Sequence, residues 1–324
     1  MLKTILVPLD GSPLSETALE PASVLARRFN ADLLLVHTLY PDQPQGGVSD
    51  PQGYLEAVAG HLHSEGVMAQ ISLLPMEPAL GILDEAEFSH VDLIVMITRA
   101  RAGLAGLLHP SVTWEVLRQA HAPIMACKIA SEDDPALAVK CLPRFMTDSQ
   151  APILVPLDGS PQAESALPLA EELAATFGNT LLLVSVPEHP LPIYASPTLF
   201  GPAGVGTDSE LIAQAAEVAD KETQSYLERK RAELANAGLR VKFEIGAGPA
   251  ASGIEEIARR RQAGLIVMAS HGRGWLGRLM LGSVAQKVLR DVETPVLLVR
   301  RAPSAADAQP PPAQPEAPEP PAPR

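Results

Sequence analysis

An internal duplication constrains the fold of this chain more than any other feature of its sequence. Residues 5–12 and 153–160 both read I-L-V-P-L-D-G-S, and the two copies lie 148 residues apart. Later in each copy, residues 91–96 (V-D-L-I-V-M) match residues 263–268 (A-G-L-I-V-M) at an offset of 172 residues. The second copy therefore carries an insertion of 24 residues between these anchors. We expect two versions of one folding unit in a single chain.

The duplication and the local composition divide the chain of 324 residues into four parts. The two copies are expected to span residues 1–130 and 151–301, and each has the size of one domain. Residues 131–150 are predicted to be a linker. Residues 302–324 are rich in Pro, Ala and Glu, so they are predicted to form a disordered tail. A role for this tail as a polyproline II ligand stays open.

Each copy alternates strand-like apolar runs with helical patterns. In the second copy, strands are expected at residues 153–157, 180–186, 241–245, 265–269 and 295–300. Ser160 and Pro161 are predicted to cap and begin the first helix, and Ser252 and Glu255 to form a capping box for a later one. This alternation predicts an α/β fold with a doubly wound, parallel, five-stranded sheet in each copy. Such sheets bind ligands at the carboxyl ends of their strands.

Composition excludes several classes of function. The formal charge of −13, without a basic stripe, argues against a general nucleic-acid binder. No apolar run reaches the roughly 18 residues of a membrane helix, so no membrane association is expected. Cys127 and Cys141 lack the spacing of a metal site, and His61 and His63 lack partner ligands, so no metal site is predicted. These features favour a cytoplasmic protein.

A glycine-rich stretch follows the fourth strand of the second copy. Residues 268–283 read M-A-S-H-G-R-G-W-L-G-R-L-M-L-G-S. Gly272 to Gly277 formally match G-x-G-x-x-G, but a dinucleotide fingerprint belongs at the first βα turn, where this chain has L-D-G-S-P. Gly282 directly precedes a helical pattern. Its missing side chain would let a phosphate reach the helix N-terminus, where Ser283 could add a donor.

The spacing G-2x-G-9x-G-[ST] after a strand, together with an opening V-P-x-D-G-S turn, resembles the universal stress protein family. The chain is similar to a tandem member with two such domains. The resemblance implies the adenine nucleotide α-hydrolase-like fold and ATP as a ligand, with or without Mg²⁺. It assigns nucleotide binding to Pro156, Asp158, Val186, Met268, Ala269, Gly272, Gly282, Ser283 and Val284.

Within this set, the resemblance implies contact of Asp158 with the ribose and adenine side, and an adenine pocket lined by Pro156 and Val186. The residues from Ala269 onward would hold the phosphates. Ala269 stands where the family motif has its first Gly, although Ala keeps the backbone N–H group.

The first copy departs from the motif at its phosphate end. At the offset of 172, Ala100 stands for Gly272 and Pro110 for Gly282. Proline offers no N–H group to an anion, so a degenerate nucleotide site is predicted there. The last strand mediates dimers in single-domain relatives. By resemblance, residues 124–128 and 295–300 are predicted to pair as an intra-chain pseudo-dimer; a homodimer stays open.

We therefore predict a stress-response protein that binds ATP in its C-terminal domain and acts as a regulator or adaptor for an unidentified protein partner. Little or no hydrolysis is expected, because no nucleophile–base pair is found and no catalytic residue is assigned. Two alternatives stay open: an interaction protein that needs no nucleotide, motivated by Ala269, and a slow ATPase or phosphotransferase, motivated by Asp158 and His271. Asp158 can also simply cap its turn, because Asp10 persists in the degenerate copy.

Overall fold

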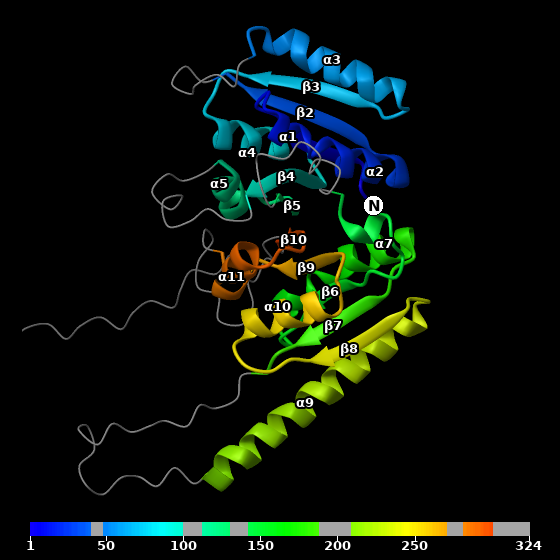
Figure 1. Cartoon of the computed structure of the whole chain (residues 1–324), viewed down its shortest axis with the longest axis vertical. Coiled ribbons are helices and arrows are strands. Elements are labelled where there is room, and N and C mark those ends of the chain that lie inside the picture. Colours follow the sequence, from blue (N-terminus) through cyan, green and yellow to red (C-terminus); the bar gives the residue numbers. More distant parts are fainter. Residues whose placement is uncertain (40–47, 100–111, 130–141, 188–208, 271–280, 301–324) are drawn as a thin grey trace, which may run out of the picture.

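A computed structural model describes residues 1–39, 48–99, 112–129, 142–187, 209–270 and 281–300. Its strands form one ten-stranded sheet in the order β3-β2-β1-β4-β5-β10-β9-β6-β7-β8, which runs the length of the molecule in Figure 1. All neighbouring strands are parallel except β5 and β10. The expected α/β fold, with two five-stranded parallel sheets in one chain, is confirmed.

The elements of the two halves correspond one to one. The first half contains β1 (Thr4–Pro8), α1 (Pro13–Glu16), α2 (Leu19–Phe29), β2 (Asp32–Thr38), α3 (Pro51–Ser64), β3 (Ala69–Leu74), α4 (Pro78–Phe88), β4 (Leu93–Arg99), α5 (Val112–Gln119) and β5 (Ile124–Ile129). The second half contains β6 (Ile153–Pro156), α6 (Pro161–Glu164), α7 (Leu167–Phe177), β7 (Leu181–Ser185), α9 (Ser209–Asn236), β8 (Val241–Ile245), α10 (Ala250–Arg260), β9 (Leu265–Ala269), α11 (Ser283–Asp291) and β10 (Val296–Val299).

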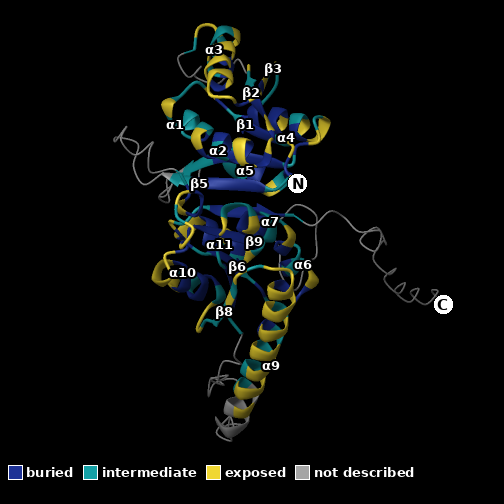
Figure 2. Ribbon diagram, turned by 90° about the vertical axis from the view of Figure 1, so that its right-hand side faces the viewer, coloured by how far each residue is buried: buried dark blue, intermediate teal, exposed yellow. Residues whose placement is uncertain are grey.

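Helices cover both faces of the sheet. One core layer joins α2, α3, α7 and α9 to the strands, and the opposite layer joins α4, α5, α10 and α11. Successive strand residues alternate between the layers: Leu183 belongs to the first and Leu182 and Val184 to the second. Figure 2 shows the strands buried at the centre and α9 extending beyond the sheet with much of its surface exposed. Among the described helices, none combines the length and apolarity needed to cross a bilayer.

Two local predictions differ from the structure. The helix expected after Ser160 begins there, but it is divided into α6 and α7, because the Ser165 hydroxyl donates to the Gln162 carbonyl at 2.6 Å and ends the first turn. The capping box at Ser252 is wrong. The helix begins at Ala250, after Pro249, and the Ser252 hydroxyl instead accepts from Lys287 at 3.3 Å.

The end of the segment between the halves packs onto the second half. A short 3₁₀ helix, η3 (Arg144–Met146), presents Phe145, whose side chain is 1 % exposed. Its ring lies edge-on to Phe177, with centroids 5.2 Å apart. A Cβ added at Gly264 would lie 2.4 Å from the Phe145 nitrogen, so only glycine allows this close approach. Residues 142–150 therefore contribute to the core of the second half.

The two halves meet through β5 and β10. Their antiparallel register pairs Val296 with Ala126 and Leu298 with Ile124, so the predicted pairing within the chain is confirmed. Beyond the strands, Lys128 donates to the backbone carbonyl of Val292 at the end of α11. Arg300, its counterpart at the offset of 172, donates to carbonyls at the C-terminal end of α5. Each half thus supplies a cation to a helix C-terminus of the other, where a positive charge is favourable.

Burial removes part of the hydration of these two cations, which disfavours their charged forms. Burial lowers the pKa of Lys128 to about 8, and the carboxylates of Asp291, Glu293 and Glu255 oppose the shift only in part. Burial also lowers the pKa of Arg300, which nevertheless stays protonated because guanidinium groups titrate above about pH 12. Only the Lys128 side of this interface therefore changes charge in an accessible pH range.

The Lys128→Met variant tests this assignment. An unfolded lysine keeps its proton up to a pKa of about 10.4, whereas folded Lys128 releases it near 8. Between these values the unfolded chain binds more protons, so the free energy of unfolding should rise with pH, by about 1 to 2 kcal/mol for this partly exposed group. Denaturant unfolding at pH 7.5 and pH 10 should show this rise in the parent protein and lose it in the variant.

Lys242→Met, at an exposed lysine on β8, is the matched control and should keep the rise. An equal pH dependence in the parent and the Lys128 variant would contradict a buried, easily deprotonated Lys128.

Candidate functional site

The turn after β6 holds Asp158 by local hydrogen bonds. Asp158 Oδ1 accepts from the Ser160 backbone N–H at 2.9 Å and from the Ser160 hydroxyl at 2.5 Å. The same hydroxyl oxygen accepts from Ala163 N at 3.1 Å and so caps α6. Gly159 adopts φ 79°, a left-handed conformation that favours glycine. The sequence D-G-S-P therefore builds a rigid turn that fixes one carboxylate at the carboxyl end of the sheet.

The first half repeats this turn. Asp10 Oδ1 accepts from the Ser12 N–H at 2.9 Å and from the Ser12 hydroxyl at 2.6 Å. Burial would raise the pKa of Asp10, but the hydrogen bonds from Ser12 and Ser15 outweigh it and hold the pKa below its usual value. Because the turn is the same in both halves, its capping role is structural. Any ligand contact by Asp158 is additional to that role.

The N-terminus of α11 lies beside the end of β9. Gly282 caps this helix with an extended ψ of 147°, and no side chain among the described residues caps it in addition. The Gly282 N–H donates to the Ser270 carbonyl at 2.9 Å, which ties the helix start to the residue that follows β9. The N–H groups of Ser283 and Val284 belong to the first helical turn, and such groups have no partner within their own helix. This arrangement suits an anion.

The sheet order brings the remaining candidate residues to one edge. Strand β6 lies between β7 and β9, so Pro156, Val186 and Ala269 stand at the carboxyl ends of three adjacent strands. All three are half-buried. Met268 is 5 % exposed and belongs to the core layer under α10 and α11, which leaves little of its side chain for a ligand. Gly272, together with His271 and Arg273, falls in residues 271–280, outside the described residues.

A duplicated contact beside the Asp158 turn escaped the sequence analysis. The Tyr226 hydroxyl on α9 donates to Glu164 Oε1 at 2.8 Å, and Tyr54 donates to Glu16 in the first half at 2.9 Å. Burial and the neighbouring glutamate raise the pKa of each tyrosine, so both stay protonated donors at neutral pH. The two offsets, 148 for the glutamates and 172 for the tyrosines, were the signal in the sequence. These pairs anchor the helix after β2 and β7 to the turn of each half.

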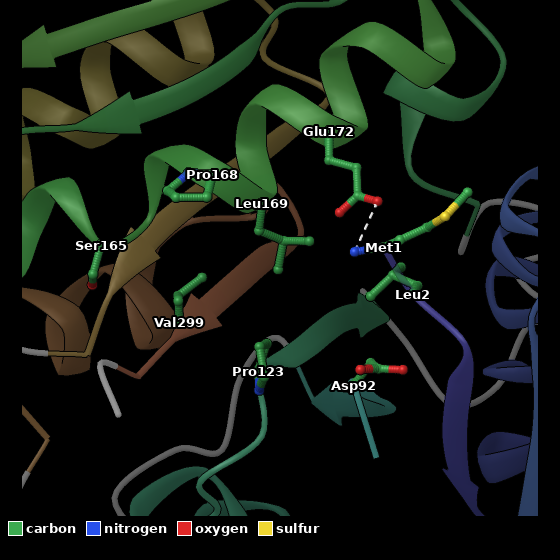
Figure 3. Close-up of a pocket in the computed structure, with 9 residues that line it drawn as sticks. All are labelled: Met1, Leu2, Asp92, Pro123, Ser165, Pro168, Leu169, Glu172 and Val299. Carbon is green, nitrogen blue, oxygen red and sulfur yellow. Dashed lines mark ion pairs between the residues drawn. The ribbon is translucent and has the colours of Figure 1, made fainter. Parts of the chain in front are cut away.

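Two hollows among the described residues lie away from this edge. One, of about 290 Å³, opens where the halves meet and is shown in Figure 3; the Met1 amino group there forms an ion pair with Glu172 at 3.2 Å. The other, of about 630 Å³, lies between α4 and the C-terminal end of α5. Neither is lined by a residue of the sequence-predicted nucleotide set. We therefore base the candidate site on the strand ends and the α11 N-terminus, not on cavity size.

Comparisons with known proteins match both halves of the chain to one family and its fold. The model of the universal stress protein family matches residues 1–128 and 151–300. A universal stress protein of Methanocaldococcus jannaschii is 31 % identical over 149 residues, covering 46 % of this chain and 81 % of that protein. One of Mycobacterium tuberculosis is 26 % identical over 317 residues, covering 92 % and 97 %. The crystal structure of a universal stress protein from Archaeoglobus fulgidus shares the fold, with a TM-score of 0.65, 18 % identity and coverage of 92 % and 96 %.

Removing the hydroxyl of the turn serine should destabilise both halves alike. Ser160→Ala removes the hydroxyl that caps α6 and donates to Asp158 Oδ1, and it should cost about 1 kcal/mol of unfolding free energy. Ser12→Ala is the matched change in the first half and should cost a similar amount. Chemical denaturation monitored by circular dichroism measures both. A loss confined to one variant would show that the two turns are not equivalent.

Proposed function

This chain belongs to the universal stress protein family, and on that premise we propose that it binds ATP through its second half. We further propose that it works in the cytoplasm as a stress-response regulator or adaptor, with little or no hydrolysis. The observation that carries the proposal is the N-terminus of α11, capped by Gly282 and tied to the end of β9. It offers backbone donors and a positive helix end at the position where the family motif holds phosphates.

The resemblance to the family implies the roles of the individual residues, and their places at the carboxyl ends of the strands support those roles. Pro156 and Val186, at the ends of β6 and β7, line the adenine side, and Asp158 faces the ribose. Ala269, Gly272 and the helix start from Gly282 to Val284 hold the phosphates. No group of three His, Cys, Asp or Glu side chains in the described ranges can hold a metal ion.

We expect little hydrolysis because Asp158, the acidic residue of the nucleotide-binding set, is held by its own turn. Asp158 Oδ1 already accepts two hydrogen bonds from Ser160. These two hydrogen bonds hold the carboxylate within its turn. Asp158 is therefore better suited to holding a ribose hydroxyl than to activating water.

The two halves have different roles in this proposal. We propose that residues 1–130 form a domain with a degenerate site, and that residues 151–301 form the nucleotide-binding domain. The first domain acts as the intra-chain partner, because its β5 takes the place that a second subunit would occupy beside β10. Pro110 stands in its sequence where the second domain has Gly282.

The Gly282→Val variant tests the site directly. A branched side chain at the cap would keep the phosphates from the first N–H groups of α11. Charge-assisted hydrogen bonds contribute about 1.5 to 3 kcal/mol each. Losing two of them should weaken ATP binding about 100-fold or more, as measured by isothermal titration calorimetry. Pro110→Gly, the reciprocal control in the first half, should leave the affinity of the parent protein unchanged.

The protein purified without added nucleotide provides a second readout. Denaturing it and separating the supernatant by chromatography should release an adenine nucleotide from the parent but not from the Gly282 variant. Unchanged affinity in that variant would remove the α11 N-terminus as the site. Absence of both carried nucleotide and ATP binding at millimolar concentration would favour the nucleotide-independent interaction protein instead.

A further inference from the structure

The two halves differ most sharply at the turn that follows their third strand. Paired strands fix the correspondence: His37 pairs with Leu73, as Ser185 pairs with Ile245. The next position is therefore Leu74 in the first half and Gly246 in the second. Two positions further on, the first half has Met76 and the second half Gly248. α4 and α10 then begin at equivalent residues, so the turn has the same length in both halves.

The side chains of this turn lie against the end of the neighbouring strand. In the first half, a Cβ added at Gly81 of α4 would lie 2.9 Å from Thr38 Cγ2, 3.1 Å from Met76 Cγ and 3.5 Å from Leu74 Cδ1. Thr38 is the counterpart of Val186, at the offset of 148. Leu74 and Met76 are both half-buried. They therefore gather around Thr38 and the first turn of α4.

In the second half the same place holds no such side chains. The three heavy atoms nearest to a Cβ added at Gly253, the counterpart of Gly81, would be the two Val186 methyl carbons, at 2.9 and 3.2 Å, and the Ala247 carbonyl oxygen, at 3.1 Å. A Cβ added at Gly246 would lie 2.8 Å from Val186 Cγ2. Gly248 adopts φ 79°, a conformation in which a side chain is strained. Val186 thus packs against two glycines, and positions 246 and 248 of this turn carry no side chain where the first half has Leu74 and Met76.

We propose that Gly246 and Gly248 keep the base side of the second half open for a purine, and that Leu74 and Met76 close the equivalent place in the first half. This inference rests on the proposed function, because it assumes that Val186 faces the base. Gly246 acts as a positioning residue: it lets Val186 lie back against α10. The first half would then reject a nucleoside at its base side, independently of Pro110 at its phosphate side.

The proposal predicts a selective loss in Gly246→Leu, which installs the residue found at this position in the first half. Adenosine binding should weaken at least about tenfold, whereas binding of inorganic tripolyphosphate, which reports on the phosphate side of the site, should change less than about twofold. Gly60→Leu is the matched control, because a Cβ at Gly60 on α3 meets nothing within 4 Å. Calorimetric titration of both ligands, with thermal melts as a check on folding, gives the readout.

The reverse change keeps the proposal testable if Gly246→Leu does not fold. The double variant Leu74→Gly, Met76→Gly should bind a second adenosine per chain, where the parent binds one. Equal weakening of adenosine and tripolyphosphate in folded Gly246→Leu, or no second adenosine site in the double variant, would overturn the proposal. If the parent itself bound neither ATP nor adenosine, the proposed function would fail and this inference with it. A parent that binds both while Gly246→Leu binds adenosine unchanged would refute this inference alone.

Discussion

The antiparallel pairing of β5 with β10 is the contact on which the rest of the molecule depends. It turns two five-stranded sheets into one continuous sheet and removes an exposed edge from each half. Lys128 and Arg300 reinforce it by donating to helix C-termini across the boundary. Because the two halves contribute equivalent strands and equivalent cations to this boundary, each half acts toward the other as a second subunit would. A half can therefore lose its own ligand site and remain necessary for the fold.

Contacts that are the same in both halves are structural, whereas positions that differ between the halves are candidates for function. Asp10 and Asp158 build the same turn, and Tyr54 and Tyr226 make the same contact with a glutamate. These features are present whether or not the phosphate motif is, so they are explained by folding alone. The differences gather at the strand ends, where the second half has glycines and the first half has larger residues or proline. A nucleotide needs room and backbone donors there, which glycine leaves and side chains remove.

Much of the fold could be predicted from the sequence because the duplication and the apolar periods are strong. The bounds predicted for β8 and β9 agree with the structure. The division between α6 and α7 could not be predicted from periodicity, since the apolar residues keep helical spacing while the Ser165 hydroxyl ends the turn. The S-x-x-E pattern at Ser252 predicted the wrong start for α10. Pro249, which follows the Gly248 turn, is the N-cap, so the helix begins earlier, at Ala250.

The candidate site was predictable in part. The structure places Asp158 just after β6 and Gly282 at the N-terminus of α11, as expected, while their roles toward a ligand stay predictions. The Tyr226–Glu164 contact was missed because it depends on how the long helix after the insertion docks, which no local pattern encodes. The packing of Val186 against Gly246 was missed for a similar reason. It needs the register between β7 and β8, which is a property of the assembled sheet.

We propose that the duplicated chain retains one nucleotide site out of two, in its second half. The number of ATP molecules bound per chain at saturation tests it most directly, by equilibrium dialysis of the full-length protein against labelled ATP. We expect one ATP per chain. Two per chain would show that the first half still binds despite Pro110, Leu74 and Met76, and none would show that the α11 N-terminus is not a phosphate site.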